Sequence, residues 1–469
     1  MPIRVYNDLT QRKEELVPLK EGKFGIYLCG PTVYGPAHVG NLRTFVSFDM
    51  IRRYLQYRGY QVTFVQNITD IDDKMIRGAV ERGVTVGELA KQFEELFIED
   101  TKALGIEPAD VYPRATEHIP EIIDLIKTLE ARGLAYNIDG DVYFEVPKFE
   151  AYGQLVHQNL EELQAGARVD VDERKRHPMD FALWKKQKPG EPAWDSPWGP
   201  GRPGWHIECS AMAMKYLGET VDIHGGGIDL VFPHHENEIA QSTGATGQPF
   251  VRYWMHGAFL NFEGEKMSKS LGNIFTLGEL KKKFHPEVLR FFFLSSHYRS
   301  PLNYSEELLR SAEASQERIY NTLRNVKYLE EVSETAELTP TEASFLERLD
   351  GCRRRFLEAM DDDFNSAEAI GILFEITRDV NAQIAGGASK ALTRKILGLY
   401  RQFGGQVLGL FWRAWEDETL DAEIAELVEK RQAARKAKNW AEADRIRDEL
   451  NSRGIVLEDT PRGVRWKRK

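Results

Sequence analysis

The chain has few cysteines and no apolar segment long enough to cross a membrane. Its three cysteines, Cys29, Cys209 and Cys352, lie far apart in a sequence of 469 residues. A sparse and odd-numbered set does not build a disulfide framework and is typical of proteins from a reducing compartment. The sequence contains no run of about 18 uncharged apolar residues, and residues 1–10 lack the apolar run of a signal peptide. We therefore expect a cytoplasmic protein with no membrane partner.

The chain also lacks an overall positive charge, but its charge is unevenly distributed. The net charge of −11 is weak evidence against a nucleic-acid partner. Residues 430–469, however, hold 13 Lys and Arg against 6 Asp and Glu, a net charge of +7, so the rest of the chain carries −18. A basic module on an acidic body predicts contact with a polyanion. The alternative is a solvated helical face followed by a basic tail.

The first part of the chain alternates strand and helix patterns. A short apolar run, Gly25–Cys29, predicts a buried strand that ends in a cluster of glycine and proline. Apolar residues then recur at helical spacing from Leu42 to Leu55, and Tyr60–Gln66 is rich in β-branched and aromatic residues. Strand, glycine-rich turn, helix and strand make the βαβ unit of a parallel, nucleotide-binding sheet. The predicted fold class is α/β.

The length predicts several domains, and the pattern changes along the chain. We assign residues 1–110 to the first half of the α/β domain, 111–203 to an insertion, 204–304 to the second half, 305–419 to an all-helical bundle and 420–469 to the basic module. The insertion and the second half are expected to contain the helix Ile119–Arg132, the strand Asp141–Val146, the helix Trp205–Leu217, the strand Thr220–His224, the helix His234–Ser242 and the strand Tyr253–Phe262. The bundle helices are expected at Ser305–Val332, Ala343–Met360, Ala367–Ile384 and Lys390–Leu410, and short strands of the basic module at Ile455–Leu457 and Val464–Trp466.

Two short motifs suit the handling of a nucleotide. His38-Val39-Gly40-Asn41 opens a predicted helix, where free backbone N–H groups and the helix dipole attract an anion. A helix-capping cluster explains this tetrapeptide about as well. Lys266-Met267-Ser268-Lys269-Ser270 follows a predicted strand, and its two lysines can converge on a triphosphate and stabilise charge as pyrophosphate leaves. The alternative for the second motif is a solvated basic turn.

Together these motifs resemble the HIGH and KMSKS signatures of class I aminoacyl-tRNA synthetases, whose catalytic domain is a Rossmann-type parallel sheet. One departure is Asn41, which takes the place of the second histidine of the first signature, although its amide can still donate a hydrogen bond to phosphate. Similarity to the cysteinyl-tRNA synthetase family runs essentially from end to end. The segments that carry it are Cys29–Tyr34, Asn67–Lys74, Gly204–Ser210, Asp222–Gly227 and Phe232–Glu238.

Four residues are candidate metal ligands. His234 and Glu238 are four apart on a predicted helix and therefore share one face, while Cys29 ends a strand and Cys209 lies on another helix. Spacing alone leaves helix capping and core packing open, but the resemblance implies that these four residues bind one zinc ion. The neighbouring His235 and Glu236 are expected at the surface or in support of the ligands, and Cys352 in helix packing.

The resemblance also implies roles for other residues. His38, Lys266 and Lys269 are expected to be catalytic, and Gly40, Asn41 and Gly226 to bind ATP with them. Thr69, Trp205, His224 and Asp229 are expected to bind the substrate. The first three resemble residues that shape the amino-acid pocket, and Asp229 is a candidate to bind ribose or the amino group. The residues themselves also allow core packing for Trp205, a loop hydrogen bond for His224 and a tight turn at Gly226.

The implied function is the ATP-dependent activation of cysteine, with Mg²⁺, and its transfer to the terminal ribose of tRNA-Cys by a monomeric enzyme. Zinc would distinguish the cysteine thiolate from the hydroxyl of serine, which a hydrophobic pocket cannot do. Three alternatives remain open at this stage. One is a paralogous ligase that joins activated cysteine to an amino-sugar acceptor, another is a catalytically silent tRNA-binding paralog, and the most distant is a zinc hydrolase.

Overall fold

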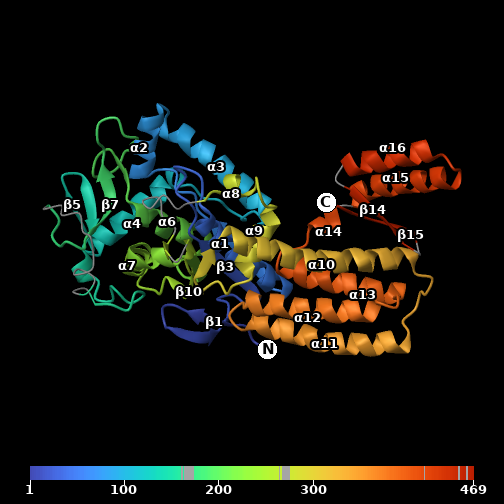
Figure 1. Cartoon of the computed structure of the whole chain (residues 1–469). Coiled ribbons are helices and arrows are strands. Elements are labelled where there is room, and N and C mark those ends of the chain that lie inside the picture. The colour runs from blue at the N-terminus through green and yellow to red at the C-terminus, as the bar shows by residue number, and fades with distance from the viewer. Residues whose placement is uncertain are drawn as a thin grey trace. The chain divides into compact units, whose positions relative to one another are not determined.

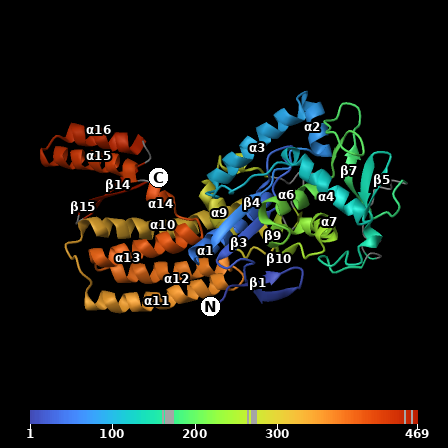
Figure 2. The same cartoon turned by 180° about the vertical axis from the view of Figure 1, so that it is seen from behind.

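Figures 1 and 2 present a computed structural model of the chain from opposite sides. It describes residues 1–159, 162, 174–262, 265–266, 275–416, 418–452, 455–460 and 463–468. The chain divides into two compact units, Met1–Leu410 and Phe411–Lys469. Among the described residues, no helix combines the length and the apolar character needed to span a membrane.

A four-stranded parallel sheet forms the centre of the first unit. Its strands are β3 (Lys23–Leu28), β4 (Gln61–Gln66), β9 (Val221–Gly227) and β10 (Val251–Gly257), in the order β10-β9-β3-β4. The chain continues from β3 to β4 on one side and from β9 to β10 on the other, so the strand order reverses between β3 and β9. In such sheets, ligands bind beyond the carboxyl ends of the strands at the point of reversal. The predicted α/β fold class is confirmed.

Helices cover both faces of this sheet. Helix α1 (Val39–Tyr57) joins β3 to β4, and its Phe48 ring occupies the place where a Cβ on Gly225 would lie. Helices α6 (Trp205–Leu217) and α7 (Glu236–Thr246) contribute to a buried cluster around Tyr27. Tyr27 is paired with His224, the residue before Gly225, and successive strand residues point to opposite faces of a sheet. This cluster therefore lies on the face opposite α1. Helix α6 has the predicted bounds. The predicted helix His234–Ser242 begins instead within a π-helical turn, η4 (Val231–His235), that leads into α7.

The insertion contains more β structure than the sequence predicts. Helix α4 (Ile119–Ala131) and strand β6 (Asp141–Phe144) lie at the expected places, but β6 belongs to an antiparallel sheet of order β5-β6-β7-β8. The additional strands are β5 (Ala135–Ile138), β7 (Phe181–Lys186) and β8 (Gly201–Pro203). The sheet has a core of its own, in which Ile126 of α4, Phe144 and Trp184 are buried together.

Other short elements complete the first half of the chain. They are the hairpin strands β1 (Arg4–Asn7) and β2 (Arg12–Glu15), the helices α2 (Asp73–Arg82) and α3 (Val86–Ala103), and the short turns η1 (Ala115–Glu117), η2 (Val146–Lys148) and η3 (Ile228–Leu230). Helix α3 begins with a capping box in which Thr85 and Glu88 exchange hydrogen bonds between side chain and backbone.

A small mixed sheet follows the central one. The predicted strand Tyr253–Phe262 is in fact two strands, β10 and β11 (Leu260–Phe262). The chain leaves the central sheet after Gly257, where the Ala258 N–H donates to the Tyr298 carbonyl. Strand β11 pairs antiparallel with β12 (Glu265–Lys266) and parallel with β13 (Leu302–Tyr304). Helices α8 (Leu277–Leu280) and α9 (Pro286–Leu294) lie between β12 and β13 in the chain.

Four long helices then lie side by side, as both views show (Figures 1 and 2). They are α10 (Glu306–Val332), α11 (Pro340–Asp361), α12 (Ser366–Ile384) and α13 (Lys390–Tyr400), close to the predicted bounds. Each begins where a Ser, Thr or Asn side chain accepts a backbone N–H of the first turn, at Ser305, Thr339, Asn365 and Ser389. The last predicted helix, Lys390–Leu410, changes after Tyr400 into a π-helical segment, η6 (Arg401–Val407).

The second unit is a small helical hairpin followed by a strand pair. Its elements are α14 (Arg413–Glu416), α15 (Glu418–Lys436), α16 (Trp440–Ser452) and the antiparallel strands β14 (Ile455–Thr460) and β15 (Gly463–Arg468). Ile424, Ile446, Leu450 and Ile455 form its buried cluster. The two strands predicted from the sequence are present and are longer than predicted.

Candidate active site

A cavity of about 250 Å³ opens at the point where the strand order reverses. Its walls include the residues that follow β3, the start of α1, the end of β9 and the link from β10 to β11. Six of the predicted site residues line it: Cys29, His38, Gly40, Asn41, Trp205 and Asp229. The site residues predicted from four separate parts of the sequence therefore meet at one crevice, in the place where α/β sheets bind ligands.

The start of α1 forms one wall of the cavity. The His38 side chain caps the helix, since its Nδ1 accepts the backbone N–H of Asn41 at 3.3 Å. A Cβ on Gly40 would lie 3.0 Å from that nitrogen, a tight contact that would displace the histidine ring slightly. The backbone N–H of Val39 donates to the Phe275 carbonyl, which ties the helix entry to the chain beyond the second motif. The capping interpretation and the ligand-binding interpretation of this motif are thus compatible.

The second motif is only partly described. The backbone of Lys266 forms the end of β12, opposite Asn261 of β11. Lys269 lies outside the described residues, as does the Lys266 side chain.

Cys29, Cys209, His234 and Glu238 form a buried cluster beside the cavity. Their ligand atoms all lie within 4.8 Å of one another, although they come from the end of β3, from α6, from η4 and from α7. The Cys29 Sγ lies 3.9 Å from the Cys209 Sγ and 3.7 Å from Glu238 Oε1, which is 3.0 Å from His234 Nε2. The ligands of a tetrahedral zinc site stand about 3–4 Å apart, so these four side chains fit one zinc ion.

The electrostatics of the cluster also suit a cation. Burial raises the pKa of the Cys29 thiol, whereas the hydrogen bond that this thiol donates lowers the pKa of Cys209 to about 6. Burial alone would raise the pKa of Glu238, but the charges of His224 and His234 hold it at about 2. Burial alone would lower the pKa of His234, but the negative Cys209 and Glu238 raise it to about 10. A divalent ion can take the place of the proton that these two anions hold on His234.

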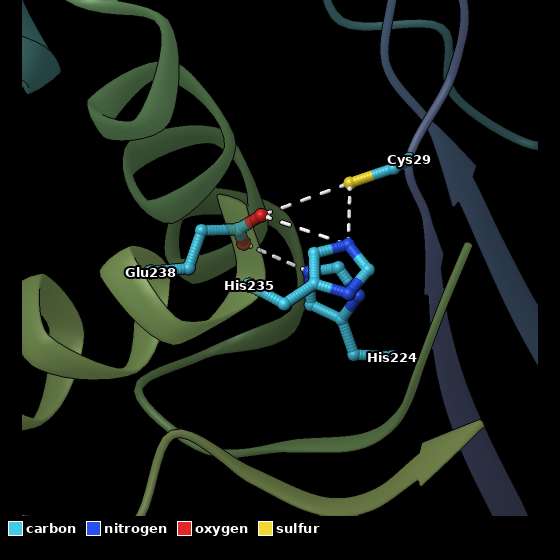
Figure 3. Close-up of side chains that lie close together, drawn as sticks. All are labelled: Cys29, His224, His235 and Glu238. Carbon is cyan, nitrogen blue, oxygen red and sulfur yellow. Dashed lines mark hydrogen bonds and ion pairs between the residues drawn. The ribbon is translucent and has the colours of Figure 1, made fainter. Parts of the chain in front are cut away.

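A second set of four side chains shares two members with the first. Figure 3 shows Cys29 and Glu238 together with His224 and His235, and the ligand atoms of these four residues also lie within 4.8 Å of one another. His224 Nε2 is 2.8 Å from Glu238 Oε2, and His235 Nε2 is 3.2 Å from the Cys29 Sγ. The first set offers two thiols where the second offers one, and soft sulfur ligands favour zinc.

The two residues between His234 and Asn237 are not at the surface. His235 and Glu236 are both fully buried. His235 lies between Cys29 and His256, whose other ring nitrogen is 2.6 Å from a carboxylate oxygen of Asp8. Glu236 accepts the backbone N–H groups of Gly153 and Leu155 and so fixes a loop of the insertion to α7. The sequence contains no signal for His256 or Asp8, because each acquires its place only through long-range contacts.

The four predicted pocket residues have different environments. The ring of Trp205 stacks on His234 at 4.3 Å and is 37% exposed, so it joins the cluster to the cavity. Thr69 is buried and accepts a hydrogen bond from the Asn67 side chain, and His224 is buried on β9. Asp229 is exposed at the rim. Close packing leaves no room for a side chain at the ATP-binding candidate Gly226, since a Cβ there would lie 2.8 Å from the His235 ring.

The fold and this arrangement of motifs define a class I aminoacyl-tRNA synthetase. Residues 15–314 match the family described as the class I (C) catalytic domain of tRNA synthetases. The fold is similar to the methionyl-tRNA synthetase of Mycobacterium tuberculosis in complex with methionyl-adenylate, with a TM-score of 0.59 and 18% identity over 82% of this chain and 89% of that one. It is also similar to the LeuRS of Agrobacterium radiobacter K84 in a ternary complex with tRNA and LeuAMS, with a TM-score of 0.61 and 12% identity over 84% of this chain and 85% of that one.

The particular family follows from two further matches. Residues 355–412 match a DALR domain, and residues 417–466 match the anticodon binding domain of cysteinyl-tRNA ligases. The cysteine–tRNA ligase of Symbiobacterium thermophilum is 57% identical over the full length of both chains. The chain belongs to the cysteine–tRNA ligase family, and it joins cysteine to tRNA with ATP. An anticodon binding domain disfavours an amino-sugar acceptor, and full-length identity to a ligase disfavours a silent paralog or a hydrolase.

Proposed function

We propose that Cys29, Cys209, His234 and Glu238 hold one zinc ion that selects cysteine for activation and transfer to tRNA-Cys. The observation that carries the proposal is the buried set of two sulfurs, one imidazole and one carboxylate next to the cavity at the carboxyl ends of β3 and β9. When bound, zinc supplies a soft Lewis acid that prefers a thiolate to a hydroxyl oxygen. The metal is needed because the side chains of cysteine and serine have nearly the same shape, and a hydrophobic pocket alone cannot discriminate between them by a large factor.

The other residues bind and orient the reactants. Trp205, Thr69 and His224 shape the cysteine pocket, with the indole of Trp205 packed on the ring of His234. Asp229 binds ribose or the amino group of the substrate. Gly40, Asn41 and Gly226 receive the adenosine and phosphate groups. The N-terminus of α1 lines the cavity, and the positive end of its helix dipole favours the negative phosphates there.

Two displacements make up the reaction. The carboxylate of cysteine attacks the α-phosphorus of ATP in line, and pyrophosphate leaves with the electrons of the broken P–O bond. His38, Lys266 and Lys269 stabilise the charge that develops on the phosphates, and Mg²⁺ bound with ATP would add positive charge there. The terminal ribose hydroxyl of tRNA then attacks the carbonyl of the adenylate and releases AMP. Neither step needs a nucleophile from the protein.

The parts beyond the catalytic residues hold the tRNA. We assign residues 1–110 and 204–304 to the catalytic domain, 111–203 to the insertion, 305–419 to a helical bundle that binds the tRNA body and 420–469 to anticodon recognition. The net charge of +7 over residues 430–469 favours phosphate contacts. The side chain of Trp440, 59% exposed, offers a surface on which a base can stack.

We place the protein in the cytoplasm, as a monomer. The support for a reducing compartment is the small and odd number of cysteines, three in 469 residues, which does not build a disulfide framework.

The proposal is tested by measuring ATP–pyrophosphate exchange with cysteine and with serine, in enzyme as purified and after removal of zinc by a chelator. We expect fast exchange with cysteine alone, its loss on removal of zinc and its return when zinc is added back. Transfer to tRNA-Cys is followed in the same samples. Undiminished cysteine activation in enzyme shown by metal analysis to lack zinc would contradict the proposal.

A further inference from the structure

A buried arginine on α1 donates its hydrogen bonds to backbone carbonyls only. Arg43 is 1% exposed, and its Nη1 donates to the carbonyls of Ala258 at 3.0 Å and Phe259 at 2.9 Å. Its Nη2 donates to the carbonyls of His297 at 3.1 Å and Ser300 at 2.6 Å. Burial lowers the pKa of Arg43 to about 10, so it remains charged at neutral pH. Within the described ranges no carboxylate forms an ion pair with it, so four peptide dipoles offset the cost of burying the charge.

The four carbonyls belong to two segments that lead into the small mixed sheet. Ala258 and Phe259 line the cavity and directly precede β11. His297 and Ser300 come shortly before β13, which begins two residues after Ser300 and pairs with β11 so that Leu302 faces Leu260. The Phe259 carbonyl also accepts the backbone N–H of Leu302, so the two segments are joined to each other at the place where Arg43 holds both.

The same sheet carries the first residue of the second motif. Strand β11 pairs with β12, whose last residue is Lys266. At the other end of the connection, Arg43 stands on the helix that begins one residue after His38. The guanidinium therefore links the helix that follows one ATP motif to the two segments that lead into the sheet that carries the other.

We propose that Arg43 is a positioning residue for cysteine activation, which fixes the β11–β12 strand pair against α1 so that Lys266 and His38 act on the same triphosphate. The inference rests on the proposed roles of those two residues. Arg43 is not among the residues that line the cavity, whereas Ala258 and Phe259, whose carbonyls it binds, are. It acts by setting the separation between two groups that have to stabilise one transition state together.

The geometry requires a guanidinium. Its planar fork supplies two donor nitrogens that each serve two carbonyls, whereas a lysine ammonium has three donors at a single point and cannot serve both segments in the same way. Arg43→Lys therefore keeps the charge and loses the bridge. A misplacement of reacting groups by about 1 Å lowers rates about 100-fold, so we expect kcat for ATP–pyrophosphate exchange to fall about 10- to 100-fold, with little change in the Kd of cysteine.

A double-mutant cycle separates positioning from stability. The full chain is prepared as Arg43→Lys, Lys266→Ala and the double variant, with Arg43→Gln as a second substitution that removes the buried charge if the lysine variant does not fold. Exchange rates are expressed per folded, zinc-loaded enzyme. If Arg43 acts through Lys266, the exchange rate of the double variant equals that of Lys266→Ala within about 2- to 3-fold, because the side chain that Arg43 positions is already absent.

Arg290→Lys is the matched control. Arg290 is also fully buried and also donates to backbone carbonyls, those of Leu408, Leu104 and Gly105. It differs in that it pairs with Asp49 and contacts neither segment beside the cavity. We expect a lower Tm and an almost unchanged exchange kcat. An unchanged kcat in Arg43→Lys, or losses that multiply in the double variant, would overturn the proposal for Arg43 alone. An unchanged kcat in Lys266→Ala would overturn the role of that lysine and the coupling with it.

Discussion

Replacement of Cys209 by serine isolates the contribution of one sulfur to metal binding. Cys209 is 1% exposed, and its pKa of about 6 results mainly from the hydrogen bond donated by Cys29. The thiolate therefore exceeds the thiol by more than about 10 to 1 at pH 7.5, even before a metal binds. A serine hydroxyl of nearly the same size stays protonated at this pH and is a poor ligand for zinc. Cys209→Ser thus changes the ligand chemistry with little change in packing.

The expected loss can be bounded from the geometry. Removal of a partner that merely supports a ligand lowers metal affinity about 10- to 100-fold. Cys209 lies among the ligand atoms themselves, so we expect its zinc Kd to rise more than about 100-fold, or about 2.7 kcal/mol. The Kd is measured by competition with a chromophoric chelator, after thermal melts have established that the variant is folded.

Cys352→Ser provides the matched control, because Cys352 is a partly exposed cysteine on α11 and no member of either candidate metal set. Its zinc Kd should equal that of the unaltered enzyme. An unaltered zinc Kd in Cys209→Ser would refute the assignment. It would favour the second set of ligands, Cys29, His224, His235 and Glu238, which does not include Cys209.

Three further outcomes follow from the same account. Lys269→Ala should lower kcat for ATP–pyrophosphate exchange about 100- to 1,000-fold and leave the Kd of cysteine unchanged, because the lysine acts on the transition state; a raised KM for ATP alone would contradict this role. Truncation after Leu410, at the boundary of the two units, should preserve exchange but sharply reduce aminoacylation and weaken the salt dependence of tRNA binding; full aminoacylation by the truncated chain would contradict the assignment of residues 420–469. Asp100→Asn should stabilise the fold, because Asp100 is 2% exposed, its Oδ1 has no hydrogen-bond partner among the described residues, and burial raises its pKa to about 6. A folded-state pKa above the unfolded value of 3.8 means that the unaltered protein loses stability as pH rises through this interval. Asp100→Asn should therefore be more stable than the unaltered protein by ~1–2 kcal/mol at pH 8 and equally stable at pH 4. Equal gains at both pH values in urea titrations would contradict this prediction.

The long helices are the part of the fold that the sequence predicts best. Helix α6 has the predicted bounds, and α10 differs from its prediction only at its first residue. Such segments repeat their apolar spacing over several turns and begin with recognisable caps, so local information is sufficient. The central βαβ unit is predictable for a similar reason, because glycine and proline separate its strands from its helix.

The sheet of the insertion is not predictable in this way. Strands β5 and β8 have four and three residues, too few to establish an alternating pattern. Strand β8 lies in a segment rich in Pro, Gly and Trp that predicts a loop, and it becomes a strand only because β7 offers hydrogen-bonding groups beside it. Tertiary context decides the conformation of such segments.

The candidate site was accessible from the sequence only in part. Cys29 and Cys209 are 180 residues apart, so no spacing rule connects them, and the resemblance to a family supplied the set of ligands. The helical spacing of His234 and Glu238 was the only local signal, and the structure places their ligand atoms 3.0 Å apart. Arg43 could not be identified at all, because its partners are backbone carbonyls and these carry no side-chain signature.

The most direct test of the central claim is the count of sulfur atoms around the bound zinc, measured by X-ray absorption at the zinc edge with and without substrate. Cys29 and Cys209 supply two sulfurs to the proposed site. We expect two sulfur neighbours in the enzyme alone, three when cysteine is added, and two when serine is added in its place. A sulfur count that does not change on addition of cysteine would contradict recognition of the substrate by its thiolate.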